Sequence, residues 1–166
     1  MPLFLSTFVN KVDKKGRVSV PAAFREALAA SVPMQSNKIV IFRSSRFGAL
    51  EGCDVGRMEL LSRGLDNFDQ FSAEQADLAA AIFADAQALP FDPEGRVMIP
   101  KDFLAHAGIA DAAAFVGGGP TFQIWHPDTF KRHQEEARKR ALAANINLRV
   151  LNQINGASTP KAGQPI

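Results

Sequence analysis

The chain has little of what disulfide-linked, metal-binding or membrane proteins need. Its 166 residues include one cysteine, Cys53, which excludes an internal disulfide and favours a reducing compartment. The three histidines, His106, His126 and His133, lack metal-ligand spacing, so we expect no metal and no cofactor. The longest apolar stretches, such as residues 78–83, fall far short of the roughly 18 residues of a membrane span. Since no basic leader precedes an apolar run either, we expect a cytoplasmic protein without a membrane partner.

Motifs for catalysis are also missing. No residue near Cys53 marks it as a nucleophile, and the glycine run at 117–119 lacks the Gly-Lys-Ser/Thr ending of a phosphate loop. That run lies between two expected strands, where a hairpin loop is the simpler interpretation. We therefore expect no catalytic residues, and a hydrolase is only a distant alternative.

What the chain does contain is an internal repeat. The segments 12–28 and 91–107 share six identities in seventeen positions, namely Asp, Gly, Arg, Val, Pro and Phe. Unrelated segments of this length would share roughly one, so duplication is indicated. The copies are 79 residues apart (92 − 13), a spacing that favours two small, intertwined units over one ordinary domain.

Charge differs strongly between the copies. Residues 1–50 carry eight Lys/Arg and two Asp/Glu, residues 51–100 three and ten, and residues 101–166 eight and five. The segment charges are thus +6, −7 and +3, which sum to the net charge of +2. A basic first copy favours an anionic partner, although charged stretches are often only solvated faces.

Each copy has a simple local pattern. Residues 7–12 and 17–20 alternate like strands, and the turn between them contains a glycine that can take a positive φ. We predict a hairpin, followed at Pro21 by a short helix whose buried face carries Phe24 and Leu28.

Further elements follow from periodicity and capping. A second strand pair is expected in each copy, and helices are expected between the copies and after the second one. A capping box at Ser72 begins the second linker helix. The expected strands are 39–42, 49–51, 113–116 and 122–125, the expected helices are 54–65, 72–86 and 127–144, and a disordered tail is expected from residue 155.

These motifs carry a family resemblance. The segment Asp13 to Pro21 (D-K-K-G-R-V-S-V-P), followed by Phe24, resembles the MraZ family of bacterial DNA-binding regulators, and Asp92 to Pro100 with Phe103 is similar to that family's second half. The resemblance implies an α+β fold of the AbrB and SpoVT type. Its two swapped-hairpin β-barrel units would lie in one chain, joined by a helical linker, and the chains would assemble into a ring-shaped oligomer.

The resemblance also implies a function. Similar proteins bind direct repeats of double-stranded DNA in the promoter of the division and cell wall gene cluster, usually as repressors, and associate with the nucleoid. The implied domains are a first unit at 7–54, a helical linker at 55–82, a second unit at 83–129, a C-terminal helix region at 130–154 and the tail at 155–166.

Basic residues at the turns are the candidate DNA contacts. Arginine can place two donors on a guanine edge or a phosphate, and a two-stranded ribbon fits the major groove. Structural roles are expected for the turn residues, because a carboxylate facing DNA would repel phosphates. The DNA-binding candidates are Lys14, Lys15, Arg17, Arg25 and Arg96, with Lys11, Arg43 and Arg46 weaker, and the structural turn residues are Asp13, Gly16, Asp92 and Gly95.

Two alternatives remain open. The first is structural: Asp13 and Arg17 form an ordinary salt bridge across the turn. The second is functional: the whole chain is a non-catalytic oligomeric scaffold for a protein partner. The second copy has Pro93 and Glu94 where the first has two lysines, and Met98 where the first has Ser19. We therefore expect it to serve packing more than DNA, with Arg96 either a weaker DNA contact or a partner of an acidic residue such as a neighbour's Glu94.

Overall fold

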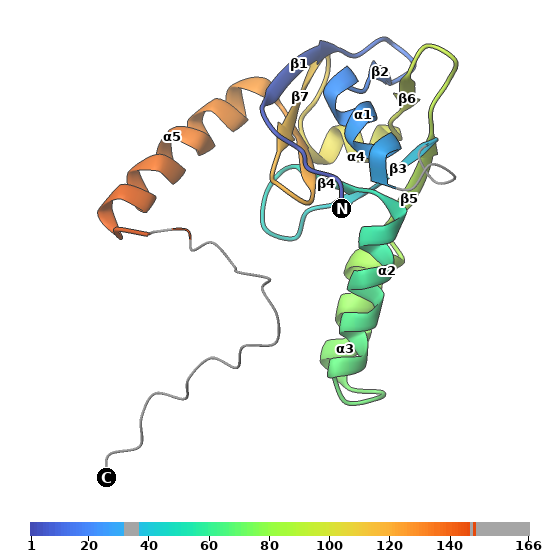
Figure 1. Ribbon diagram of the computed structural model, residues 1–166, viewed down its shortest axis with the longest axis vertical. Helices are drawn as coiled ribbons and strands as arrows, with labels where there is room; N and C mark the ends of the chain where they lie inside the picture. Colours follow the sequence, from blue (N-terminus) through green and yellow to red (C-terminus); the bar gives the residue numbers. More distant parts are fainter. Residues whose placement is uncertain (32–36, 147, 149–166) are drawn as a thin grey trace. The chain divides into compact units, whose positions relative to one another are not determined.

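The protein is an α+β structure, seen here in a computed structural model that describes residues 1–31, 37–146 and 148. Residues 1–133 form one compact unit, and residues 134–166 belong to a second unit. The predicted tail at 155–166 and the end of the predicted region 130–154 lie outside the described residues. In chain order the elements are β1 (Thr7–Lys11), β2 (Arg17–Ser19), α1 (Ala22–Ser31), β3 (Lys38–Arg43), β4 (Leu50–Cys53), α2 (Val55–Gly64), the 3-10 helix η2 (Leu65–Asn67), α3 (Ala73–Leu78), the π-helix η3 (Ala79–Phe83), β5 (Gln87–Pro90), β6 (Arg96–Met98), α4 (Lys101–His106), β7 (Ala112–Gly117), β8 (Phe122–Trp125) and α5 (Pro127–Ala143) (Figure 1).

Strands of both copies share one antiparallel sheet. Its order is β1-β7-β8-β4-β3-β5, and β2 and β6 form a separate two-stranded ribbon. When the copies are exchanged, β1 matches β5, β7 matches β3 and β8 matches β4, so the strand order reads the same from either edge. The molecule therefore has a pseudo-two-fold relation between its copies, and each copy is completed by strands of the other.

The predicted local hairpin is wrong. Strands β1 and β2 meet only at the isolated bridge Val12↔Val18 beside the turn, and β1 pairs with β7 while β2 pairs with β6. The turn residues fix the local chain reversal, but they do not choose the strand partner. Pairing across the copies places Val18 against Val97, and both are buried.

Two further expectations differ from the structure. The expected closed barrel is absent from the described ranges, where β1 and β5 are the open edges of the large sheet. The helix expected over 72–86 is shorter in the structure, where α3 and the π-helix η3 together end at Phe83. The chain then enters β5, which pairs with β3. Asp85, two residues after η3, binds Arg43 at the end of β3, and this contact holds the chain where it returns to the sheet.

Aromatic side chains fill the core between the sheet and the short helices. Phe24 of α1 packs edge to face on Phe4 and Phe8, and Phe4 in turn packs on Phe122. Phe24 and Leu28 are both buried, as the helical spacing predicts, and Phe103 is the buried equivalent on α4. Burying each such side chain contributes roughly 1.5–3 kcal/mol, so this cluster holds the two copies together.

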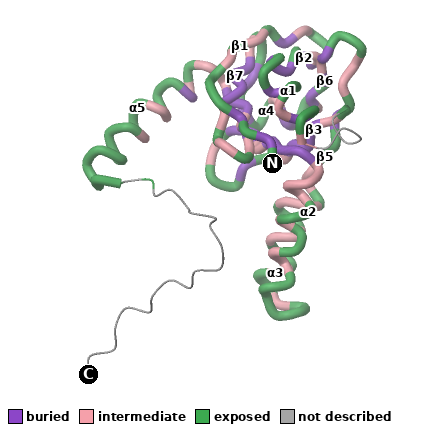
Figure 2. The backbone as a smooth tube through the Cα atoms, viewed as in Figure 1, coloured by how far each residue is buried: buried purple, intermediate pink, exposed green. Residues whose placement is uncertain are grey.

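The linker between the copies is helical, as predicted, and forms an arm (residues 55–83) that projects from the body of the unit (Figure 1). Asp54 caps α2 by accepting a bond from the Arg57 N–H, and Ser72 caps α3 through the Gln75 N–H, which confirms the predicted cap. The helices of the arm contain no buried residue (Figure 2). In the part of the chain that the structure describes, no helix combines the length and apolar character needed to cross a bilayer.

Candidate nucleic-acid interface

The β2–β6 ribbon has one buried and one outward face. Val18 pairs with Val97 and faces the core, whereas the flanking pairs Arg17↔Met98 and Ser19↔Arg96 face outward. Because residues 17–19 align with residues 96–98 in the repeat, the ribbon is symmetric about the central valine pair. Its outward surface, here the ribbon face, therefore carries one arginine from each copy.

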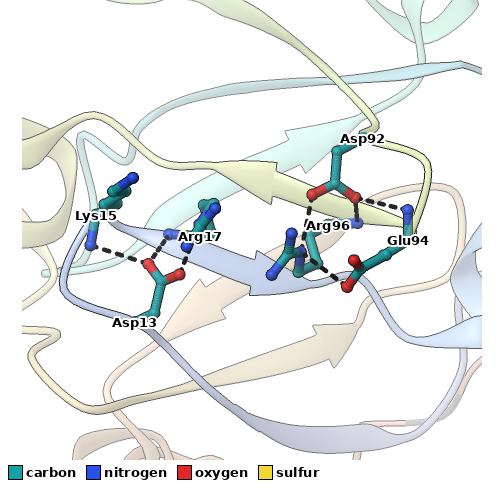
Figure 3. A network of polar contacts seen from close by, with 6 residues as sticks. All are labelled: Asp13, Lys15, Arg17, Asp92, Glu94 and Arg96. Carbon is teal, nitrogen blue, oxygen red and sulfur yellow. Dashed lines mark hydrogen bonds and ion pairs between the residues drawn. The ribbon is translucent and has the colours of Figure 1, made fainter.

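The first turn (residues 13–16) is built around one carboxylate. Asp13 Oδ1 accepts bonds from the N–H groups of Lys15 and Arg17 at 2.9 Å each, and Oδ2 accepts one from Arg17 Nε at 2.6 Å (Figure 3). The bond from the Arg17 N–H is the main cause that lowers the pKa of Asp13, and the Arg17 guanidinium adds to it. The carboxylate is thus directed into its own turn.

The second turn (residues 92–95) repeats this geometry. Asp92 Oδ1 accepts from the N–H groups of Glu94 and Arg96 at 2.9 Å, and Oδ2 accepts from Arg96 Nε at 2.8 Å (Figure 3). The pKa of Asp92 is lowered, mainly by the Arg96 N–H, and the pKa of Arg96 is raised, mainly by its bond to Asp92. Glu94 of the same chain, 3.7 Å from Arg96 Nε, adds a second acidic neighbour.

Each turn is also fastened to the other copy. The Gly16 carbonyl accepts a bond from the Ile99 N–H at 2.9 Å, and the Gly95 carbonyl accepts one from the Val20 N–H at 3.1 Å. Both glycines have positive φ, 83° and 75°, which L side chains adopt only with strain. The two turns therefore sit at the two ends of one ribbon, held by matching bonds.

Both arginines keep part of their donor capacity. Nε of Arg17 and of Arg96 is bound by the turn carboxylate, and their Nη atoms have no hydrogen-bond partner among the described residues. The side chains are 35% and 29% exposed, and both line a depression of about 230 Å³ whose wall also includes Phe91 and Met98. Such guanidinium groups can place paired N–H donors on a phosphate or a guanine edge.

The remaining cations of the first copy have different surroundings. Lys14 and Lys15 are exposed in the first turn. Arg25 is exposed on α1, yet its Nε donates to the Val20 carbonyl at 3.2 Å and its guanidinium covers Gly95, where an added Cβ would lie 2.7 Å from Nη1. This contact crosses between the copies, and no local pattern in the sequence points to it.

The three weaker candidates are not equivalent. Lys11 is exposed on β1. Arg43 is bound by Asp85, lies 3.8 Å from an Asp102 oxygen and stacks on the Phe103 ring. Arg46 lies 3.6 Å from a Glu51 oxygen and over the Phe47 ring. Arg43 is therefore already engaged within its own chain.

Sequence reasoning missed one feature of the ribbon face. Met98 is 56% exposed beside Arg17, where an apolar strand residue is expected to pack inside. Strand alternation along β6 predicts the exposure of Met98, because Val97 faces the core and the residues on either side of it must face outward. Among the described residues, no group of three or more His, Cys, Asp or Glu side chains is placed to hold a metal ion.

The duplicated α+β fold thus presents a two-stranded ribbon that carries one arginine from each copy. Comparison with known proteins specifies the family. Residues 82–151 match the family model described as "MraZ protein, putative antitoxin-like". The chain is 39% identical over 163 residues to the "Transcriptional regulator MraZ" of Gluconobacter oxydans, an alignment that covers 98% of this chain and 96% of the relative. It is 40% identical over 152 residues to the protein of that name from Rickettsia canadensis, covering 92% of this chain and 100% of the relative. The chain belongs to the MraZ family.

Proposed function

We propose that this chain is a sequence-specific DNA-binding transcriptional regulator that reads promoter direct repeats with its ribbon face. The names of its relatives support a transcriptional regulator that is not an enzyme. DNA recognition is supported by one observation: two arginines, one from each copy, present on one exposed face Nη donors that no described residue binds.

The chemistry of the turns supports DNA as the partner. A two-stranded ribbon enters the major groove, where Nη donors can bind the O6 and N7 atoms of guanine. Asp13 and Asp92 would repel phosphates if they faced outward, but the carboxylate of each accepts hydrogen bonds from N–H groups of its own turn. The turns therefore offer donors rather than bare carboxylates.

The two ends of the ribbon are expected to contribute unequally. The first turn adds Lys14 and Lys15, whereas the second turn has Pro93 and Glu94, and Glu94 lies close enough to Arg96 to compete with a phosphate for it. We expect Arg17 to contribute more to DNA affinity than Arg96, and Arg25 to add a phosphate contact from α1.

Self-association is part of the proposal, including the swapped-hairpin units and the ring. Exposed apolar side chains occur on the first residues of the chain, including Leu3, Leu5 and Val9, and on the arm at Phe68 and Phe71. Contact between such unlike patches on successive subunits is head to tail, and it forms a ring when the rotation between subunits closes. Several ribbons on one assembly raise the effective concentration for each further repeat of DNA.

The target and location follow the family. We propose repression of the division and cell wall gene cluster by a cytoplasmic, nucleoid-associated protein. No cofactor is part of this mechanism.

Fluorescence anisotropy tests the proposed function. The purified protein is titrated onto its own upstream promoter DNA and onto scrambled DNA of equal length, each across a salt series. We expect tighter binding to the promoter at every salt concentration, and a log affinity that falls linearly with log salt. Equal, weak and steeply salt-dependent binding to both DNAs would contradict specific recognition.

A second candidate function is a scaffold for a protein partner. It is favoured by the arm, whose exposed Phe71 is flanked by acidic residues, including Asp69 and Glu74. The scaffold predicts no sequence preference in the DNA titration and unchanged DNA behaviour when Phe71 is replaced.

A further inference from the structure

A second depression lies away from the ribbon. It has a volume of about 220 Å³ and lies where the end of β3 and the loop after it meet α2 of the arm and η3. It shares no lining residue with the depression between Arg17 and Arg96. Its polar wall includes Arg43, Arg46, Glu51, Arg57 and Thr121, and its apolar wall includes Leu61 and Ile82.

Arg57 is the unusual residue of this cavity. Its side chain forms no hydrogen bond or ion pair with any residue that the structure describes, and its Nε is buried. Its backbone N–H is held by the Asp54 cap, which fixes the residue at the start of α2. A buried donor on a charged group is unfavourable unless an acceptor reaches it.

The other charged groups of the cavity do not supply that acceptor. Glu51 is the one carboxylate in the lining, and its oxygens already accept bonds from Ser44 Oγ and Gln123 Nε2. Arg43 is bound by Asp85 outside the lining. Arg46 makes a long contact of 3.6 Å to Glu51 and is 70% exposed, so its guanidinium is able to turn toward a ligand.

We propose that this cavity binds a small oxyanion of the phosphate type, with Arg57 as its main donor and Arg46 as the second. Arginine suits this ligand, because its planar fork matches two oxygens of a phosphate. The volume is below the roughly 300–1,000 Å³ of pockets for drug-sized ligands, so it suits free phosphate or the phosphate end of a small monoester. The chain would then bind a small anion without using the ribbon face.

Isothermal titration calorimetry tests the proposal directly. Sodium phosphate is titrated into the full chain in phosphate-free buffer, with chloride keeping the ionic strength constant. We expect saturable binding that Arg57→Met weakens by about tenfold or more, because one charge-assisted contact is lost. Arg63→Met, at an exposed position of the same helix, is the matched control and should bind like the parent chain.

Stability without ligand separates a binding role from a structural one. Because Arg57 has no partner among the described residues, Arg57→Met should unfold in phosphate-free buffer at the same or a higher temperature than the parent chain. A lower temperature together with unchanged phosphate binding would assign Arg57 to the fold and overturn the proposal. Arg46→Met, whose side chain is mostly exposed, repeats the binding test without altering a buried group.

The source of the phosphate is resolved by two further titrations. Comparison of inorganic phosphate with glycerol phosphate shows whether a free ion or a monoester binds more tightly, and saturable binding of either supports the site. Promoter DNA is then titrated with Arg57→Met and with Arg17→Ala. If both lose DNA affinity equally, the cavity holds a DNA phosphate and the small-ligand proposal is wrong. Absence of saturable binding by both anions also overturns it, without affecting the proposed function.

Discussion

Asp13 and Asp92 each bind the arginine four residues later and so decide which part of that arginine remains free. The carboxylate takes Nε and the backbone N–H, and the Nη atoms stay open to a partner. A guanidinium held in this way loses less conformational freedom on binding than one whose side chain rotates freely. Gly16 and Gly95 complete the turns, because their positive φ lets the carbonyl reach the opposite copy.

Alanine substitutions at three glycines should separate the cost of backbone strain at positive φ from the cost of a steric clash of the added Cβ. Gly108→Ala (φ 63°, with open space around a Cβ) should cost about 1–2 kcal/mol of stability from the left-handed backbone alone. Gly16→Ala should cost clearly more, because its Cβ would lie 2.7 Å from the Ile99 carbonyl oxygen, which is backbone. Gly95→Ala should fall between, because the flexible Arg25 side chain can move aside. Urea unfolding measures all three, and equal losses would contradict the close approach of the two copies.

At the scale of the element, the ribbon with its turns acts as one unit. The matching bonds of Gly16 to Ile99 and of Gly95 to Val20 hold both ends, so the two arginines keep a fixed relation on one face. The ribbon face is therefore a rigid surface, whereas the helices of the arm contain no buried residue.

The turns predict how stability depends on acid. The pKa values of Asp13 and Asp92 are lowered from the ordinary 3.8, first by the backbone N–H of the paired arginine. A lowered folded-state pKa means that the stabilisation is present above about pH 4 and is lost as the pH falls through the folded-state value. The free energy of unfolding should therefore fall from about pH 5 toward pH 2.

The double variant Asp13→Asn/Asp92→Asn should reduce this acid sensitivity. Asp77→Asn is the matched control, because Asp77 is exposed and forms no ion pair or side-chain hydrogen bond in the described ranges. Urea unfolding at several pH values measures the slope. A slope unchanged by the double variant would show that the turn carboxylates do not stabilise the fold.

At the scale of the whole molecule, two copies fold as one compact unit with a palindromic strand order. The duplication was evident in the sequence, and so were the turns, the buried Phe24 and the cap at Ser72, because each depends on residues close together in the chain. The strand partners were not evident. Residues near Val18 specify a strand but not that it pairs with Val97, which lies on the other copy.

The same limit applies to the candidate interface. Strand alternation places Arg17 on the outward side of its strand, and the repeat places Arg96 at the matching position. Neither pattern shows that both share one ribbon face with Met98 exposed beside them, because that depends on pairing between distant segments. Two other features also depend on distant contacts: the cover of Gly95 by Arg25, and the Arg57 side chain that has no partner among the described residues.

Assembly is tested by one residue of the arm. Phe71 is 91% exposed with φ of 66°, a strained backbone for a bulky side chain, and such strain points to a functional position. We predict that the parent chain forms an oligomer and that Phe71→Glu lowers its mass in multi-angle light scattering. Ala76→Glu adds the same charge at an exposed position of the arm and should leave the mass unchanged. An unchanged mass in Phe71→Glu would show that Phe71 of the arm is not part of the interface between subunits.

The most direct test of the central claim, that the ribbon face binds DNA, compares Arg17→Ala with Arg96→Ala on promoter DNA by fluorescence anisotropy. Circular dichroism confirms that both variants are folded, and Arg63→Ala on the arm serves as the control for loss of one positive charge. We predict that Arg17→Ala abolishes preference for promoter over scrambled DNA, that Arg96→Ala weakens it less, and that Arg63→Ala leaves it unchanged. Undiminished promoter preference in folded Arg17→Ala would show that the ribbon face does not recognise the promoter.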